Sequence, residues 1–376
     1  MYLGSFQSLQ QSIRARYIWP LFVLLLCFFC FFQSEAYGFS LKKGDIFFSL
    51  ESDSYSEPIP LHETRHHWRQ GFKHGDEAYT HKLLTQGVRW ERWSVGIFAR
   101  YDYTVRADPE TLFLINLEEN DLPLPTGRSF NLYVQGSHSK SRGVFFDYYF
   151  NDVSAGAWQF RTNLLYGYDL EIYEVSGQGA ISVDDDIVAD LQLEYFYGTD
   201  KLLERQNQSP SGYGFSFDLW GEWQFKSYEF SLEARDLFYQ LHWHEVAHTS
   251  ARADTDVVQR DSNGFISLRP LISGVEDYRS KTQTLEPRVK MNLKLPSIQK
   301  HAWILGVEHF HGFQFASAGV RWGSSESYQQ FLISSRGPSL MLQMVRQGWH
   351  LAIAMDRWVD RAYSLTLDAG FRFRVF

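Results

Sequence analysis

The last stretch of the chain, Tyr363 to Phe376, alternates between apolar and polar side chains with a period of two. Its apolar side consists of Tyr363, Leu365, Leu367, Ala369, Phe371, Phe373 and Val375. Its polar side carries Ser364, Thr366, Asp368, Arg372 and Arg374. This alternation predicts a β-strand with one apolar face and one wet face. In a soluble sheet so long a strand would expose a sticky edge, whereas a closed membrane barrel needs this pattern, with the apolar face toward lipid.

The ending from Ala369 to Phe376 resembles the assembly signal of bacterial outer-membrane β-barrel proteins, which closes on an aromatic residue. The resemblance is to this porin-like class and to no narrower family. It implies a location in the outer membrane of a Gram-negative bacterium, insertion by the barrel assembly machinery, and contact with outer-membrane lipid and lipopolysaccharide. One feature departs from the pattern, because Phe376 follows Val375 and is out of phase with the apolar face. A small bulge at the end of the strand would restore the phase.

The first 36 residues have the organisation of a secretory signal peptide. Arg14 and Arg16 precede an apolar run from Ile18 to Phe32, and Ser34-Glu35-Ala36 supplies small residues for cleavage. The alternative is a retained membrane helix, but the run is shorter than the roughly 18 residues that a span needs. We therefore expect residues 1–36 to be removed and residues 37–376 to form the barrel.

Composition limits the remaining function classes. Both cysteines, Cys27 and Cys30, lie in the expected signal peptide, so the mature chain has no disulfide framework. Without residues 1–36 the 36 basic and 44 acidic side chains become 34 and 43, a net charge of −9, with no basic tract of the kind that binds nucleic acid. Aromatic residues make up 17% of the chain, which suits barrel strands whose rings gather at the membrane interfaces.

Alternating stretches recur along the chain and predict an all-β fold, a closed antiparallel transmembrane β-barrel of about 16 strands, with 14 or 12 as alternatives. One short helix interrupts the pattern. Asp108 has the side chain of an N-cap, and Pro109 is suited to the first helical turn, so we expect a helix from 109 to 119. The expected strands are 39–51, 88–103, 130–138, 144–151, 158–168, the weaker 170–183, 187–197, 215–225, 228–243, 284–295, 301–311, 313–323, 327–336, 338–347, 349–357 and 362–376.

Four segments without clear alternation are expected to be long loops: the histidine-rich 52–86, 104–127, 199–212 and 244–282. With the C-terminus in the periplasm, counting strands backward places 52–86, 199–212 and 244–282 outside the cell, where long loops belong. The same count places 104–127 on the periplasmic side, where turns are short. Either its helix is a periplasmic ornament or plug, or the count is wrong by one strand.

Two short motifs raise the possibility of catalysis at the barrel rim. His244-Glu245-Val246-Ala247-His248 matches the H-E-x-x-H pattern, which binds zinc when both histidines lie on one face of a helix. Here the motif directly follows a strand and lacks a third ligand, so we predict no metal and no cofactor, with His244 and His248 as the candidates if a metal binds. Ser137-His138-Ser139 is a compact Ser/His cluster at an expected hairpin end, and a lipid-modifying rim enzyme is the third functional hypothesis.

The period of two also assigns charged side chains to the lumen. We predict these as the binding residues: Arg161, Asp190, Glu194, Asp218, Glu222, Glu233, Arg235, Arg288, Lys290, Lys294, Arg372 and Arg374. Acidic and basic walls facing each other would orient solutes in a channel, or would pair as salt bridges in a closed interior. The first hypothesis is a passive channel for small polar solutes, and the second is a non-conducting structural or export-associated barrel.

Overall fold

The computed structural model describes residues 44–65, 68, 73, 75–152, 156–181, 187–199, 209–254, 258–260, 266–268, 272–296, 301–324, 326–358 and 361–375. The expected signal peptide, residues 1–36, lies outside this part of the chain. Within it, no helix is both long and apolar enough to cross a membrane.

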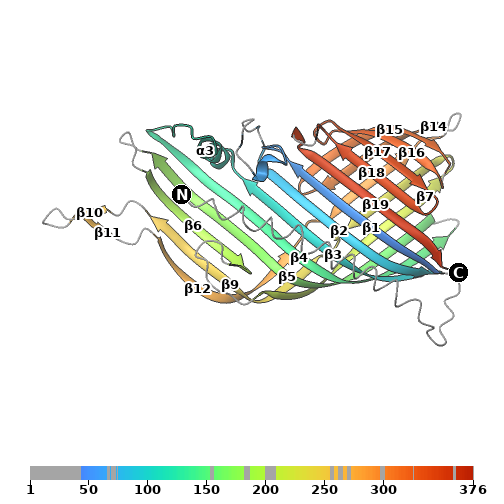
Figure 1. The fold of residues 1–376 in the computed structure, drawn as a ribbon, viewed down its shortest axis with the longest axis horizontal. Helices are drawn as coiled ribbons and strands as arrows, with labels where there is room; N and C mark the ends of the chain where they lie inside the picture. Colours follow the sequence, from blue (N-terminus) through green and yellow to red (C-terminus); the bar gives the residue numbers. More distant parts are fainter. Residues whose placement is uncertain are drawn as a thin grey trace. The chain divides into compact units, whose positions relative to one another are not determined.

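Antiparallel strands make up most of the described chain (Figure 1). The first half contains β1 (Gly44–Ser56), η2 (Glu63–Arg65), β2 (Glu77–Trp90), β3 (Trp93–Ala107), α3 (Pro109–Glu119), β4 (Arg128–Asp152), β5 (Gly156–Ile181), β6 (Ile187–Tyr197) and β7 (Ser211–Phe225). The second half contains β8 (Tyr228–Arg235), β9 (Gln240–Asp254), β10 (Val258–Arg260), β11 (Ile266–Leu268), β12 (Ile272–Thr284), β13 (Arg288–Lys294), β14 (His301–Phe310), β15 (Phe313–Gly323), β16 (Tyr328–Ser334), β17 (Ser339–Arg346), β18 (Trp349–Met355) and β19 (Ser364–Val375).

The sheet closes on itself through its first and last strands. β1 pairs with β19 in an antiparallel register that runs from Gly44 opposite Val375 to Tyr55 opposite Ser364. Seventeen strand segments belong to this one sheet, and β10 and β11 form a separate hairpin. In Figure 1, β19 and β1 lie side by side. The predicted closed antiparallel barrel of about 16 strands is confirmed.

Strand β5 is so long that two different strands pair with it along the same edge. Residues Ala157–Gly167 of β5 pair with β7, and residues Glu171–Ile181 pair with β6. On the next neighbours, β8 is continued by β9, and β13 is preceded by β12. We call β6, together with the adjoining parts of β4, β5, β9 and β12, the extension, because it continues past the end of β14.

Side chains alternate between the outside and the interior of the barrel as the sequence predicts. On β19, Phe371 and Phe373 are 50% and 64% exposed, whereas Thr366 on the other face donates a hydrogen bond of 2.7 Å to buried Asp53 of β1. The outer face is apolar on the other strands too, with exposed Val95, Ile97, Val144, Phe146, Phe160, Leu164, Phe217, Met291, Trp303, Leu305, Val307, Phe331, Ile333, Leu340, Leu342 and Ile353. This surface is suited to contact lipid.

The interior holds a packed apolar core in addition to its polar groups. Its buried members come from β3, β4, β5, β9 and the residues before β9: Phe98, Phe145, Leu165, Leu170, Tyr239, Leu241, Trp243 and Val246. Phe47 of β1 also packs against this core, and its ring centroid lies 6.0 Å from that of Phe145. Rings from separate strands therefore meet inside the barrel.

Two of the expected loops are wrong. Segment 52–86 contains the end of β1 and most of β2, so the connection is only 57–76. The outer face of β2 carries Thr80, Lys82 and Gln86, which hid its alternation. Segment 244–282 likewise contains most of β9 and β12. These belong to the extension, where the outer face is not uniformly apolar, so neither strand shows the pattern of a lipid-facing strand.

Other strand boundaries also needed correction. The stretches 130–138 and 144–151 are parts of the single 25-residue strand β4, and β5 continues the expected strand 158–168 to Ile181. Three pairs of expected strands run on in one direction, which changes the backward count: 130–138 with 144–151 as β4, 158–168 with 170–183 as β5, and 187–197 with 215–225 as β6 and β7, which are both antiparallel to β5. As a result, 108–127 joins β3 to β4 at the barrel end opposite Val375, on the same side as 57–76. The first alternative, a periplasmic helix, is therefore wrong.

The predicted helix is confirmed at its predicted bounds. Asp108 caps α3, because its side chain accepts a hydrogen bond of 2.6 Å from the backbone nitrogen of Thr111, and Pro109 opens the first turn. Leu112 and Leu117 are the buried apolar residues of this helix. As expected for a segment that must not interrupt a lipid-facing ladder, α3 lies in the connection between β3 and β4.

Connection lengths orient the barrel. At the end that holds Val375, the turns Glu91–Arg92, Lys226–Ser227 and Gln347–Gly348 are two residues long. At the other end, 57–76 and 108–127 are long. Outer-membrane barrels have short periplasmic turns and longer extracellular loops, so the end with 57–76 and 108–127 is the extracellular one.

Candidate functional site

Ion pairs connect strands from opposite sides of the barrel. Arg235 of β8 donates two hydrogen bonds to the carboxylate of Glu51 on β1, one of them 3.1 Å from Nη2 to Oε1. In one direction β2, β3, β4, β5 and β7 separate these strands, and in the other direction β13 to β19 do. The Glu51–Arg235 pair therefore crosses the lumen.

A second ion-pair cluster crosses the lumen at Asp53 of β1. Its carboxylate lies 2.9 Å from Nη2 of Arg288 on β13 and 2.8 Å from Nη1 of Arg336, which follows β16. Arg288 also lies 2.5 Å from Glu308 of β14. The side chains of Asp53 and Arg336 are 4% and 6% exposed, so water screens this cluster little.

Arg100 of β3 is the centre of a third cluster. Its guanidinium donates to Asp102 at 2.6 Å from Nε and to Asp236, between β8 and β9, at 2.6 Å from Nη1. Asp102 also lies 2.8 Å from Nδ1 of His81 on β2, and Arg100 lies over the ring of Tyr239. Four hydrogen bonds to two carboxylates hold this guanidinium in one orientation.

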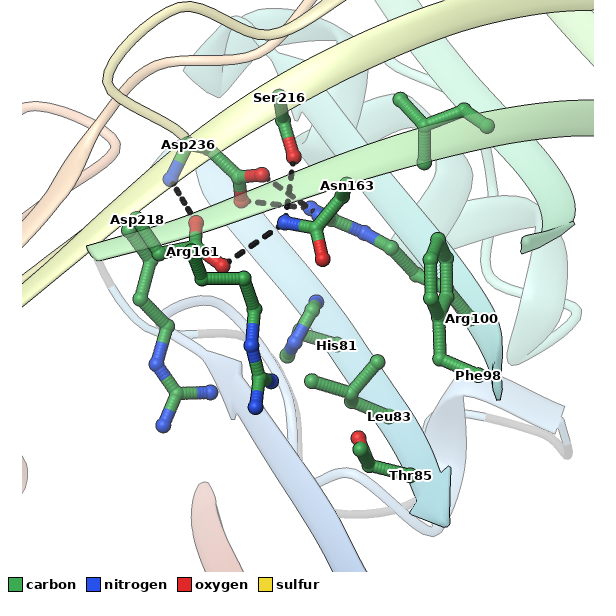
Figure 2. Close-up of a pocket in the computed structure, with 12 residues that line it drawn as sticks. His81, Leu83, Thr85, Phe98, Arg100, Arg161, Asn163, Ser216, Asp218 and Asp236 are labelled. Atoms are coloured by element: carbon green, nitrogen blue, oxygen red, sulfur yellow. Dashed lines mark hydrogen bonds and ion pairs between the residues drawn. The ribbon is translucent and has the colours of Figure 1, made fainter. Parts of the chain in front are cut away.

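The cavity between these clusters is very small. Figure 2 shows its lining, with Arg100, Asp236 and Asp218 around one end and Leu83, Thr85 and Phe98 around the other. Its volume is about 20 Å³, and a neighbouring cavity beside Tyr103 and His311 has about 10 Å³. A single water molecule needs about 10–15 Å³. Each of these two cavities has room for isolated waters and not for a hydrated solute.

A larger cavity lies on the inner face of the extension. It has a volume of about 740 Å³ and is lined by β5, β6, β9 and β12, including Glu194, Ser250 and Arg279. Next to it, His248 lies between Asp277, 2.8 Å from Nδ1, and Glu194, 2.6 Å from Nε2. This cavity is polar and lies on the extracellular side of the three clusters.

The predicted lumen charges are found as ion pairs of mixed sign and not as separate acidic and basic walls. Arg161 pairs with Asp147 at 2.6 Å, Arg235 with Glu233 and Glu51, and Lys294 with Glu229 at 2.6 Å. Asp190 pairs with Arg252, in the extension, as does Glu194 with His248. The remaining predicted residues lie on lumen strands: Asp218 and Glu222 on β7, Arg288 and Lys290 on β13, and Arg372 and Arg374 on β19.

Sequence reasoning missed several central residues. Asp53 and His81 lie in the segment that was expected to be a loop. Arg336 and Asp236 were inside the expected strands 327–336 and 228–243, but in the structure they lie in connections. Arg100 and Asp102 lie in an expected strand on the polar face, so the alternation alone would have placed them in the lumen.

The two candidate catalytic motifs do not form the expected constellations. His244 and His248 are in strand β9 and not on a helix, and His248 is buried whereas His244 is exposed beside His242. Ser137, His138 and Ser139 lie in the middle of β4 and not at a hairpin end. Both serine hydroxyls accept from Gln283, while His138 lies beside Asp169 and Glu171. In the described residues, no group of three or more His, Cys, Asp or Glu side chains is arranged to hold a metal ion.

Comparison with known proteins gives structural likenesses only. No protein family and no curated protein matches the sequence. A mutant of the monoaromatic hydrocarbon channel TodX matches with a TM-score of 0.39 and 7% identity, over 88% of this chain and 89% of that one. The β domain of the Bordetella autotransporter BrkA matches with a TM-score of 0.32 and 13% identity, over 88% and 98%. The outer-membrane protease OmpT of Escherichia coli matches with a TM-score of 0.24 and 7% identity, over 91% and 99%.

These likenesses assign no activity to the chain. Its classification as an outer-membrane protein rests on the closed sheet itself. A closed antiparallel barrel with an apolar outer face and a polar interior is the architecture of outer-membrane proteins. The chain is an outer-membrane β-barrel, and its location is the outer membrane of a Gram-negative bacterium, as the last strand predicts.

Proposed function

We propose that this protein is an outer-membrane barrel that does not conduct in its resting state. The observation that carries the proposal is the pairing of Arg235 with Glu51 and of Arg288 with Asp53, since both pairs join strands on opposite sides of the barrel. A hydrated ion or sugar would have to separate these pairs to pass.

The energetic argument supports a closed interior. Removing one partner of a buried ion pair typically costs about 3–5 kcal/mol, because the other charge is left buried without compensation. Asp53 has two arginine partners, and Arg100 has two carboxylate partners. Thermal motion alone therefore opens such a network rarely, which favours a structural or export-associated role over free diffusion.

The second candidate is a gated channel for small polar solutes. The polar lining of the 20 Å³ cavity favours it, because Arg161, Asn163 and Asp218 would interact with a polar solute once the pairs opened. In this case the Glu51–Arg235 pair is the gate, and the 740 Å³ cavity on the extracellular side is its vestibule.

Swelling of proteoliposomes in arabinose or glycine separates the two candidates. Wild-type protein should swell no faster than liposomes without protein. The double variant Glu51→Ala/Arg235→Ala removes both partners of the cross-lumen pair, and Glu233, the other partner of Arg235, keeps the nearby Lys290 and Arg288. Faster swelling of this variant supports the gated channel, and no change supports the non-conducting role. The matched control is Asp190→Ala/Arg252→Ala, which removes an exposed pair in the extension. Rapid swelling with wild-type protein would refute the closed resting state.

The partners follow from the resemblance and the outer surface. We propose contact with outer-membrane lipid and lipopolysaccharide along the apolar outer face, and insertion by the barrel assembly machinery through the strand that ends in Phe373 and Val375. Replacing Phe371 and Phe373 by serine should slow assembly, measured as loss of heat-modifiable migration on gels. Unchanged assembly would argue against this role.

A further inference from the structure

Two histidines lie side by side on the outer face of β9. His242 and His244 are both exposed, and their ring centroids are 4.6 Å apart, with the ring planes at 83° to each other. Their neighbours Leu241 and Trp243 belong to the buried core and point inward. Residues two apart on a strand point to the same face, so the backbone itself brings the two rings together. Neither the closed barrel nor the gated channel proposed above uses this pair.

A bulge in β9 separates this pair from His248. The register with β12 is interrupted at His244 and Glu245, and Glu245 has a φ of +46°. An extra residue in a strand moves every later side chain to the opposite face. His248 therefore points inward, toward Asp277, whereas His242 and His244 stay together on the outside. The bulge thus divides the two histidines of the H-E-x-x-H motif and leaves a different pair in contact.

The pair lies at the extracellular boundary of the membrane. His242 is opposite Tyr213 of β7, and His244 is opposite Ser211. Tyr213 is twelve positions along β7 from Phe225, which adjoins a two-residue periplasmic turn. A tilted membrane strand crosses the hydrocarbon in roughly 9–11 residues. Both rings are therefore beyond the hydrocarbon layer, where water and dissolved ions reach them.

The geometry of the pair suits two ligands of one metal ion. Imidazole nitrogens bind transition-metal ions at about 2.0–2.1 Å, so two rings on one ion have centroids about 4.5–5 Å apart. The observed 4.6 Å lies in this range. Nδ1 of His242 is 3.1 Å from the hydroxyl oxygen of Thr282 on β12. When Nδ1 donates to this hydroxyl, the lone pair of Nε2 is left for a metal, which is how ligating histidines are usually oriented.

We propose that His242 and His244 together bind a divalent transition-metal ion at the outer surface of the barrel, with Cu²⁺ bound most tightly. Imidazole ligands favour copper, nickel and zinc over magnesium and calcium, and Cu²⁺ leads the order of affinities for such sites. Two histidines supply two ligands, and water takes the remaining coordination positions. The site has His244 in common with the metal candidates of the sequence, and His242 replaces His248.

Chemical modification of histidines tests the site in the folded protein in detergent. Diethyl pyrocarbonate modifies free imidazole nitrogens, and mass spectrometry of peptides reports each histidine separately, including those of the connection 57–76. Buffered Cu²⁺ should protect His242 and His244 together, at a lower free concentration than Zn²⁺ does. His309 is the internal control, because it is exposed on β14 and the ring of His311, two residues on, packs instead against Tyr79. His309 should be protected only at higher Cu²⁺ concentrations.

The variant His242→Asn distinguishes a chelate from two independent ligands. Two linked ligands bind more tightly than one, so the free Cu²⁺ concentration that half-protects His244 should rise by about tenfold or more in this variant. His309→Asn should leave the protection of His244 unchanged, and heat-modifiable migration shows that each variant has folded. Equal protection of His244 in wild type and in His242→Asn would mean that each histidine binds alone and would overturn the proposal. Failure of Cu²⁺ to protect His244 at concentrations that protect His309 would overturn it too.

Discussion

The carboxylate of Glu51 and the guanidinium of Arg235 meet inside the barrel, although five strands separate β1 from β8 along the shorter path around the wall. Side chains from opposite sides can make this contact only if the two walls approach closely. On one wall, Phe47 reaches the core around Phe145 across the neighbouring strands β2 and β3, over Gly87 and Gly96. The interior of this barrel is thus packed from both sides, and its charges neutralise each other.

Removing the shared carboxylate of Asp53 should destabilise the barrel strongly. The variant Asp53→Ala leaves Arg288 and Arg336 buried without their common partner. We expect a loss of about 3–5 kcal/mol in the free energy of unfolding. Urea unfolding in detergent or liposomes measures it, and Asp190→Ala, in an exposed pair, should cost less than about 1 kcal/mol. Equal effects of the two variants would contradict the burial of the Asp53 cluster.

Adjacent residues on β17 test the assignment of the two faces. Leu342 is 50% exposed on the outer face, whereas Gln343 lies on the lumen side. An arginine at 342 should cost roughly 2–4 kcal/mol near the membrane midplane, and Gln343→Arg should cost less. Refolding into liposomes followed by urea titration gives both values. A larger cost for Gln343→Arg would mean that Gln343 faces lipid and Leu342 faces the lumen, contrary to the assignment.

The helix cap makes a local prediction. Asp108→Ala removes the acceptor for the Thr111 nitrogen, so the first turn of α3 should lose about 0.5–2 kcal/mol. Hydrogen exchange at Thr111 and Leu112 should accelerate accordingly, while exchange in β4 below the helix stays unchanged. Asp108→Asn keeps a capping oxygen and should exchange almost like wild type. Faster exchange along all of β4 would mean that the cap supports more than its helix.

One extracellular histidine predicts a pH dependence. Burial lowers the pKa of His311, in the turn after β14, below its usual value of 6.5, while nearby Glu286 and Asp102 oppose the shift and His81 and Arg288 add to it. The unfolded chain then binds the proton more readily, so stability is lost as pH falls below 6.5 toward the folded pKa. His311→Gln should flatten this part of the stability curve. A steeper loss of stability with falling pH in His311→Gln than in wild type would contradict a lowered pKa of His311 in the folded state.

Sequence reasoning predicted the parts of the fold that follow from local chemistry. The parity of Leu367 and Thr366 gave the two faces of β19, and Asp108 with Pro109 gave the helix bounds. It failed where the environment does not alternate between lipid and lumen. On β2, the polar residues Thr80 and Lys82 lie on the outer face. Strands β9 and β12 continue into the extension. None of the three strands therefore has a continuous apolar outer face.

The ion-pair partners across the lumen could not be predicted from the sequence, for a different reason. Parity places Arg235 and Arg288 in the interior but does not indicate which opposite strand comes within reach. The separation of Glu51 and Arg235 by 184 positions is set by the closure of the whole sheet. The sequence left open whether the lumen charges orient solutes or pair as salt bridges, because each charge was considered on its own strand and not against its partner.

The most direct test of the closed interior is the conductance of purified wild-type protein in planar lipid bilayers. The ion pairs Glu51–Arg235 and Asp53–Arg288 predict no stable open level at low voltage in neutral salt, with the folded state verified by heat-modifiable migration. Steady single-channel steps from the wild-type protein under these conditions would contradict the account.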